Sequence, residues 1–191
     1  MTGILGLGAY LPPRELTNDD LTKMVDTSDE WIRTRPGICS RHIADGDPTL
    51  DMAEKAARAA LADADIDASA ISLVIVTTVT EEYSTPHVSA GLIGRLGIEC
   101  PAMDIAAACT GFISGRRAAM GMIGPGEKAL VVGAEKLSRL VDWEDRATCV
   151  LFGDGAGAAI LGEGGHEILE IQLHATPDDK FCLGVEGANT M

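Results

Sequence analysis

Met103-Asp-Ile-Ala-Ala-Ala-Cys-Thr-Gly-Phe112 is the stretch that decides the fold. A short apolar run leads into a cysteine and a Thr-Gly pair, a pattern that predicts a buried strand turning sharply into a helix. Cys109 then lies at the turn, where the free N–H groups and positive dipole end of the helix stabilise a thiolate. Small neighbours allow an acyl group to approach the backbone closely. The pattern indicates either an acyl-accepting nucleophile or, as for most lone cysteines, a buried structural residue.

Segments on both sides of this stretch alternate between strand and helix patterns. Nearly continuous β-branched and apolar runs at 71–79 and 128–134 predict strands buried on both faces. Apolar residues at helical spacing predict helices at 51–64 and 88–96. This alternation favours an α/β layered fold with a largely parallel sheet.

The two ends of the chain carry further strand patterns. A first strand is predicted at 3–10, another at 152–161, and an edge strand at 167–174. At the start of the helix predicted for 51–64, Asp51 with Glu54 three residues later resembles a capping box.

Composition limits the class of protein. The 191 residues are 46% hydrophobic and 23% charged, which fits one large globular domain or most of a larger one. No basic segment precedes an apolar core at the N-terminus, and no apolar run approaches the roughly 18 residues of a membrane-spanning helix. The sequence therefore predicts a cytoplasmic protein with reduced thiols and no membrane contact. Neither zinc-site nor disulfide-framework spacing occurs among the five cysteines, Cys39, Cys100, Cys109, Cys149 and Cys182.

Charge and glycine patterns argue against two kinds of ligand, a nucleic acid and a dinucleotide. A net charge of −14 argues against nucleic-acid binding, although a local group of arginines can still bind phosphate. The stretch Gly153-Asp-Gly-Ala-Gly157 lacks the spacing of a dinucleotide-binding loop. We interpret it as a tight turn that brings the backbone close to another element.

Four motifs, in order along the chain, resemble β-ketoacyl-acyl-carrier-protein synthase III: residues 28–38, 104–112, 145–148 and 152–158. The resemblance extends from residue 1 to about residue 175. It implies a thiolase-like layered αβαβα fold, of which this chain covers the N-terminal half and the start of the C-terminal half. The implied domains are 1–162, which carries the nucleophile, and 163–191, which is incomplete.

The resemblance also implies a function. Such enzymes are homodimers that condense an acyl-CoA primer with malonyl-acyl carrier protein through an acyl-cysteine, at the start of fatty-acid synthesis. On the matching positions, Cys109 is the nucleophile, Trp31 and Arg146 sandwich the CoA adenine, and Arg35 lies near the CoA phosphates. Indole and guanidinium planes both stack on a flat base. No metal or permanently bound cofactor is implied, because the coenzyme A thioester is a substrate.

The chain departs from the family pattern in several places. The family's catalytic His and Asn fall beyond residue 191, and no histidine of this chain lies in the matching motif. Arg116 and Arg117 follow the nucleophile, so at least one guanidinium is expected to face the core and need a partner. Gly115 and Gly121 are expected to weaken that helix by roughly 0.5–1 kcal/mol each.

Two alternatives stay open on these residues. One is a related secondary-metabolite acyltransferase that uses a different acceptor or a carrier-protein donor. The other is a non-catalytic subunit that pairs with an active one. Pro36 fixes the backbone beside Arg35, and this departure weakens the expectation that Arg35 contacts the CoA phosphates.

Overall fold

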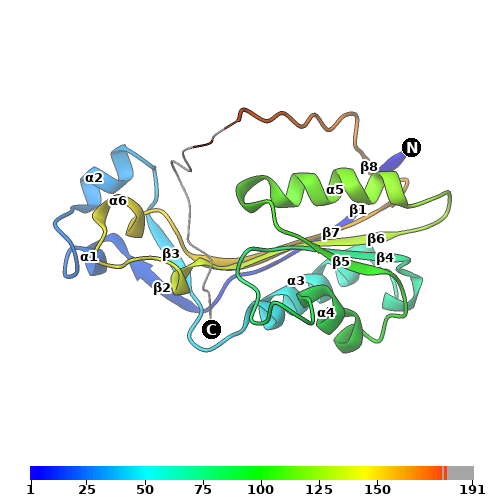
Figure 1. Ribbon diagram of the computed structural model, residues 1–191, viewed down its shortest axis with the longest axis horizontal. Helices are drawn as coiled ribbons and strands as arrows, with labels where there is room; N and C mark the ends of the chain where they lie inside the picture. Colours follow the sequence, from blue (N-terminus) through cyan, green and yellow to red (C-terminus); the bar gives the residue numbers. More distant parts are fainter. Residues whose placement is uncertain (178, 180–191) are drawn as a thin grey trace.

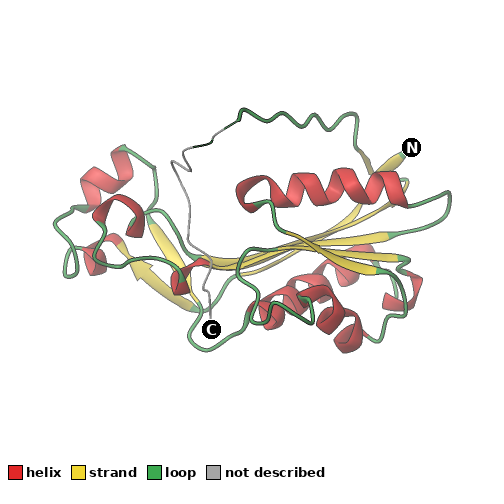
Figure 2. Cartoon of the chain, viewed as in Figure 1, coloured by secondary structure: helices red, strands yellow, loops and turns green. Residues whose placement is uncertain are grey.

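A six-stranded sheet lies at the centre of the computed structural model, which describes residues 1–177 and residue 179. Its strand order is β5-β4-β6-β7-β1-β8 (Figure 1). In chain order the strands are β1 Thr2–Tyr10, β4 Leu73–Thr77, β5 Ala102–Ile105, β6 Ala129–Lys136, β7 Asp154–Glu163 and β8 His166–Glu167. Helices cover both faces of the sheet, so the predicted α/β layering is confirmed (Figure 2).

The two faces of the sheet carry different helices (Figure 1). Helices α3 (Thr49–Ala64) and α4 (Val88–Leu96) pack on one face, against Val74 and Val76 of β4. Helix α5 (Gly111–Met122) packs on the other face, against Ile75. Successive residues of β4 thus enter two separate cores, as a strand buried on both faces requires. Three short 3₁₀ turns join these elements: η1 Ala68–Ala70, η2 Ala108–Thr110 and η3 Leu137–Arg139.

The sheet is mixed, so the prediction of a largely parallel sheet is wrong. Strand β4 runs parallel to β5 and β6, but β7 runs antiparallel to both β6 and β1. The strand–helix alternation that favours parallel pairing stops at β6, because no long helix separates β6 from β7. The edge strand predicted at 167–174 is also wrong, since β8 ends at Glu167 in the described chain. The predicted domain boundary between residues 162 and 163 stays a prediction.

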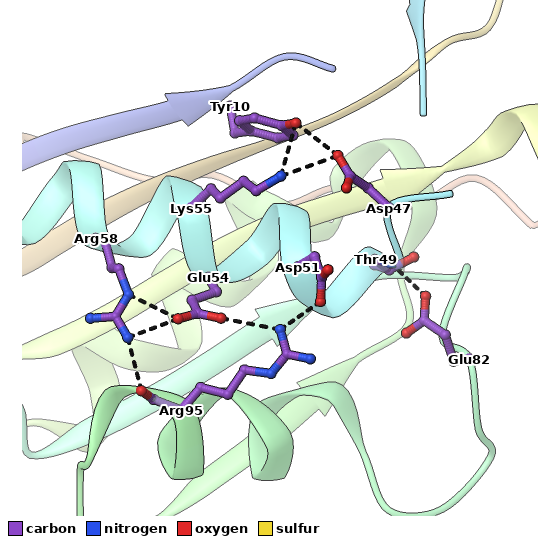
Figure 3. A network of polar contacts seen from close by, with 9 residues as sticks. All are labelled: Tyr10, Asp47, Thr49, Asp51, Glu54, Lys55, Arg58, Glu82 and Arg95. Carbon is purple, nitrogen blue, oxygen red and sulfur yellow. Dashed lines mark hydrogen bonds and ion pairs between the residues drawn. The ribbon is translucent and has the colours of Figure 1, made fainter. Parts of the chain in front are cut away.

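Polar contacts join α3 to α4 and to β1 (Figure 3). Helix α3 begins after Pro48, which offers no side-chain cap, so the predicted capping box on Asp51 is wrong. Asp51 and Glu54 instead both accept hydrogen bonds from Arg95 of α4. On the other side of α3, Lys55 donates to Tyr10 of β1 at 3.0 Å. These contacts supplement the apolar core that lies between the helical layer and the sheet.

A smaller layer lies beside one end of the sheet (Figure 1). It consists of β2 Arg14–Thr17, α1 Asn18–Leu21, α2 Asp29–Thr34, β3 Ser40–Ile43 and α6 Arg146–Cys149. Ile32 and Cys149 lie in its own apolar core. Buried Arg41 ties its parts together, because its guanidinium donates at 3.1 Å to the carbonyl groups of both Leu16 and Val150.

Apolar side chains on the α5 side of the sheet remain exposed. Leu7 is 55% exposed and Leu11 is 59% exposed, and each lines a hollow beside Phe112 of α5. We expect the protein to bind an environment-sensitive dye strongly, because exposed apolar surface of this kind attracts such probes. Replacing both leucines by serine should lower dye fluorescence. Met24→Ser, which removes a 48% exposed side chain near α1, should not. Equal fluorescence in the wild type and the double variant would contradict this expectation.

Candidate active site

Cys109 lies between strand β5 and helix α5, as the sequence predicts. It is the middle residue of η2, and its side chain is exposed rather than buried. The preceding Ala108 has a φ of +42°, in the left-handed region that costs an L-residue about 1 kcal/mol. This turn carries the chain abruptly from strand to helix. Strand β5 itself is half-buried, because it forms an edge of the sheet.

The N-terminus of α5 follows Cys109 directly and has no side-chain cap. Its N-cap, Thr110, uses its hydroxyl to donate to the Ala107 carbonyl at 3.0 Å instead. The Gly111 N–H donates to the Ala108 carbonyl of η2, and the N–H groups of the next residues have no acceptor within the helix. Together with the helix dipole, such groups favour an anion: a thiolate, or the oxyanion formed when a thiolate attacks a thioester.

Helix α5 forms without a break, although the sequence predicts a weakened helix. Gly115 is needed for packing, because a Cβ there would lie 2.7 Å from Cγ2 of Thr77 on β4. Arg117 is exposed, and Arg116 is half-buried. The Arg116 guanidinium lies 5.7 Å from the centre of the Phe112 ring, but its Nε finds no hydrogen-bond partner among the described residues. Arg116 thus has the aromatic partner Phe112 but lacks a hydrogen-bond partner for Nε, so the partner expected from the sequence is found only in part.

Cys109 lines a pocket of about 310 Å³ on the α5 face of the sheet. Glycines form much of its wall: Gly133 of β6 pairs with Gly157 of β7, and Glu135 pairs with Gly155 in the same register. These glycines leave space beside the thiol because they carry no side chain. Sequence reasoning missed Glu135, which ends an apolar run and resembles an ordinary strand terminus. Its place in the pocket follows only from the register of β6 against β7.

Trp31, Arg35 and Arg146 lie together in the smaller layer. The guanidinium carbon of Arg146 is 4.4 Å from the centre of the Trp31 ring, and that of Arg35 is 5.0 Å away. Both distances are typical of cation–π contacts. A base between Trp31 and Arg146 needs roughly 7 Å, the sum of two van der Waals contacts. The two side chains thus occupy each other's stacking face, and a base enters only when Arg146 moves aside. None of the three lines the Cys109 pocket.

Asp154 to Gly157 lie in strand β7, so the tight turn interpreted for the glycine-rich stretch is wrong, whereas the close approach to another element is confirmed at Gly153, which packs on β3. A Cβ on Gly153 would lie 2.9 Å from the carbonyl oxygen of His42. Buried Asp154 accepts hydrogen bonds from Ala44 N at 2.7 Å, Ser138 N at 2.8 Å and Ser138 Oγ at 2.6 Å. Its carboxylate joins the smaller layer to β7, a role that sequence reasoning missed because both partners are distant in the chain.

The described residues contain neither a metal-site grouping nor a membrane-spanning helix. No three His, Cys, Asp or Glu side chains there are grouped as a metal site requires. No described helix combines the length and the apolar composition needed to cross a membrane.

The chain is similar to a set of named proteins. A family model described as 3-oxoacyl-(acyl-carrier-protein) synthase III matches residues 103–177. The β-ketoacyl-(acyl-carrier-protein) synthase III of Rhodospirillum centenum is 50% identical over 194 residues, covering 96% of this chain and 60% of that relative. The crystal structure of 3-oxoacyl-(acyl-carrier-protein) synthase III from Aquifex aeolicus matches with a TM-score of 0.83 at 47% identity, covering 86% of this chain and 54% of the other.

A further solved structure is the priming β-ketosynthase of the R1128 polyketide biosynthetic pathway. It matches with a TM-score of 0.81 at 38% identity, covering 85% of this chain and 50% of the other. These similarities give the chain a thiolase-like α/β fold, as expected. The chain spans about 60% of the length of the curated relative and about half of each solved chain.

Proposed function

This chain belongs to the 3-oxoacyl-(acyl-carrier-protein) synthase III family, and on that premise we propose that it carries the acyl-accepting cysteine of a condensing enzyme in fatty-acid synthesis. The position of Cys109 supports the proposal most directly. The thiol is exposed, it precedes the uncapped N-terminus of α5, and it lines a pocket walled by glycine. An acyl-transfer nucleophile needs this combination of access, anion stabilisation and space for a carbonyl group.

In the proposed reaction, the Cys109 thiolate attacks the carbonyl carbon of an acyl-CoA primer. The bond from that carbon to the CoA sulfur breaks, CoA leaves as a thiolate that takes a proton from water, and the acyl group stays on Sγ as a thioester. The positive end of the α5 dipole and its remaining N–H groups stabilise the intermediate oxyanion. Malonyl-acyl carrier protein then loses CO₂, and its carbanion attacks the acyl-cysteine and frees Sγ. We assign to this chain the first half of the reaction, within a cytoplasmic homodimer.

An alternative function differs in the acyl donor. One solved relative is a priming ketosynthase of a polyketide pathway, which favours a secondary-metabolite acyltransferase as the second candidate. Such an enzyme taking its acyl group from a carrier protein needs no nucleotide site. The cluster of one indole and two guanidinium groups at Trp31 supports the CoA donor, because it offers stacking and phosphate contacts at one place.

Binding of CoA is expected to change the fluorescence of Trp31, because an entering adenine displaces Arg146 from the indole. Arg146→Ala should weaken CoA binding by about 1 kcal/mol. The expected loss is small because CoA binding breaks the Arg146–Trp31 contact of the free protein. That cost offsets part of what Arg146 gains by stacking on the adenine. Acylation by an acyl-pantetheine, which lacks the nucleotide, should not change. The measurement is a CoA titration of tryptophan emission in a Trp143→Phe background.

Arg14→Ala is the matched control for this titration, since Arg14 is an exposed arginine that pairs with Asp45. It should leave CoA affinity unchanged. Arg35→Ala should make CoA binding less sensitive to salt, because a phosphate contact is lost. If both Arg35→Ala and Arg146→Ala keep full CoA affinity while Cys109 still accepts acyl groups, the carrier-protein donor becomes the better account.

A further inference from the structure

Glu135 is the sole carboxylate among the described residues that line the Cys109 pocket. Successive residues of a strand point to opposite faces, so Glu135 follows Val131 and Gly133 onto the face that α5 covers. Its neighbour across the ladder is Gly155, which has no side chain to separate the carboxylate from the pocket.

Neutral donors hold the Glu135 carboxylate in place. Oε1 accepts from the Val79 N–H at 3.0 Å, and Oε2 accepts from the Thr80 hydroxyl at 2.6 Å. The Thr80 carbonyl in turn accepts from the hydroxyl of Thr49 at the start of α3, at 2.6 Å; Thr49 is labelled in Figure 3. None of the ion pairs in the described chain includes Glu135, so no cation neutralises its carboxylate. Burial raises the pKa of the Glu135 carboxyl, whereas the hydrogen bonds from Thr80 and Val79 oppose that shift and favour the charged form.

We propose that Glu135 selects the charge of the acyl group that reaches Cys109, admitting uncharged groups and repelling anionic ones. This inference rests on the proposed function and deepens it. A condensing enzyme meets two thioesters, an uncharged primer and an anionic malonyl group, and the cysteine must accept only the first. A fixed carboxylate in a partly desolvated pocket raises the energy of a second carboxylate there.

Arg116 is the cation that opposes this effect. Its guanidinium stacks on Phe112, whose ring also lines the pocket. Arg116 itself does not line the pocket, whereas Glu135 does. An anion at Cys109 shares the pocket with Glu135 but not with Arg116, so we expect repulsion to be the larger effect.

Iodoacetamide and iodoacetate test the proposal, because the two reagents are close in size and differ in charge. The measurement is the ratio of their alkylation rates at Cys109 in the 191-residue protein, compared with the ratio for a free cysteine peptide. We expect Cys109 to favour the uncharged reagent on the order of five- to tenfold more than the free peptide does. Glu135→Gln should bring the ratio close to that of the peptide, whereas Glu135→Asp, which keeps the charge, should not. Glu99→Gln removes an exposed carboxylate outside the pocket and should have no effect.

A wild-type ratio equal to or below that of the free peptide would overturn the proposal, since Arg116 would then dominate. An unchanged ratio in Glu135→Gln would also overturn it. A second measurement uses acetyl- and succinyl-pantetheine: Glu135→Gln should raise the ratio of succinyl to acetyl loading of Cys109, and Glu135→Asp should not. If neither thioester loads while the alkylation ratio holds, the proposed function fails and charge selection stands. If both load equally in the wild type, charge selection fails and the proposed function stands.

Discussion

Replacement of Cys109 by serine is expected to abolish acyl transfer from acyl-CoA, lowering the rate by on the order of 10³-fold or more. A serine hydroxyl is far less ionised than a thiol, and no histidine lines the pocket to act as a base among the described residues. The substitution changes one atom of an exposed side chain, so stability should not change. Intact-protein mass spectrometry after incubation with acetyl-CoA measures the acyl-enzyme directly.

Cys39→Ser is the matched control, because Cys39 is exposed and its Sγ accepts from Nη1 of Arg33 at 3.0 Å. This variant tests whether a guanidinium near an exposed thiol is enough to make a cysteine accept an acyl group. It should leave acylation of the protein intact. Burial raises the pKa of the Cys100 and Cys149 thiols, so iodoacetamide should label both slowly. Cys109 should also react faster than Cys182, which lies outside the described residues. Full acylation of Cys109→Ser would place the acyl group on another residue and reject the proposed function.

Local patterns predicted the elements that depend on neighbouring residues. The helix at 88–96 has the predicted bounds, and the order strand–turn–helix around Cys109 is as predicted. The prediction that this strand is buried is wrong, because β5 is a half-buried edge strand. Strand pairing could not be predicted in the same way. Strand β1 pairs with β7, which lies near the far end of the described chain, and no local spacing indicates that partnership or its antiparallel direction.

The candidate site likewise combines features set by neighbouring residues with features set by residues distant in the chain. The Cys109 turn could be predicted from its own residues, whereas the grouping of Trp31 with Arg146 followed from the family resemblance, because the two residues are distant in the chain. Gly115 was misjudged as a defect because its close approach to Thr77 exists only after α5 packs on the sheet. The roles assigned to Cys109 and to the Trp31 cluster stay predictions until the variants are measured.

The buried carboxylate of Asp154 offers the largest expected effect on stability. Asp154→Ala should lower the free energy of unfolding by about 4 kcal/mol, because the buried N–H of Ala44 and the half-buried N–H and hydroxyl of Ser138 lose their acceptor. Urea unfolding measures this loss. Ser138→Ala removes only one of the donors and should cost about 1 kcal/mol.

The same variant should also separate the two parts of the structure. Asp154 connects Ala44, just after β3, and Ser138 of η3 to the first residue of β7, so its loss frees the smaller layer from the sheet. Trp31 and Trp143 both pack on the core of the smaller layer, whereas far-UV circular dichroism reports the whole fold. In Asp154→Ala, tryptophan emission should therefore change at a lower urea concentration than the dichroism signal. Coincident transitions with a loss below about 1 kcal/mol would show that Asp154 does not hold the two parts together.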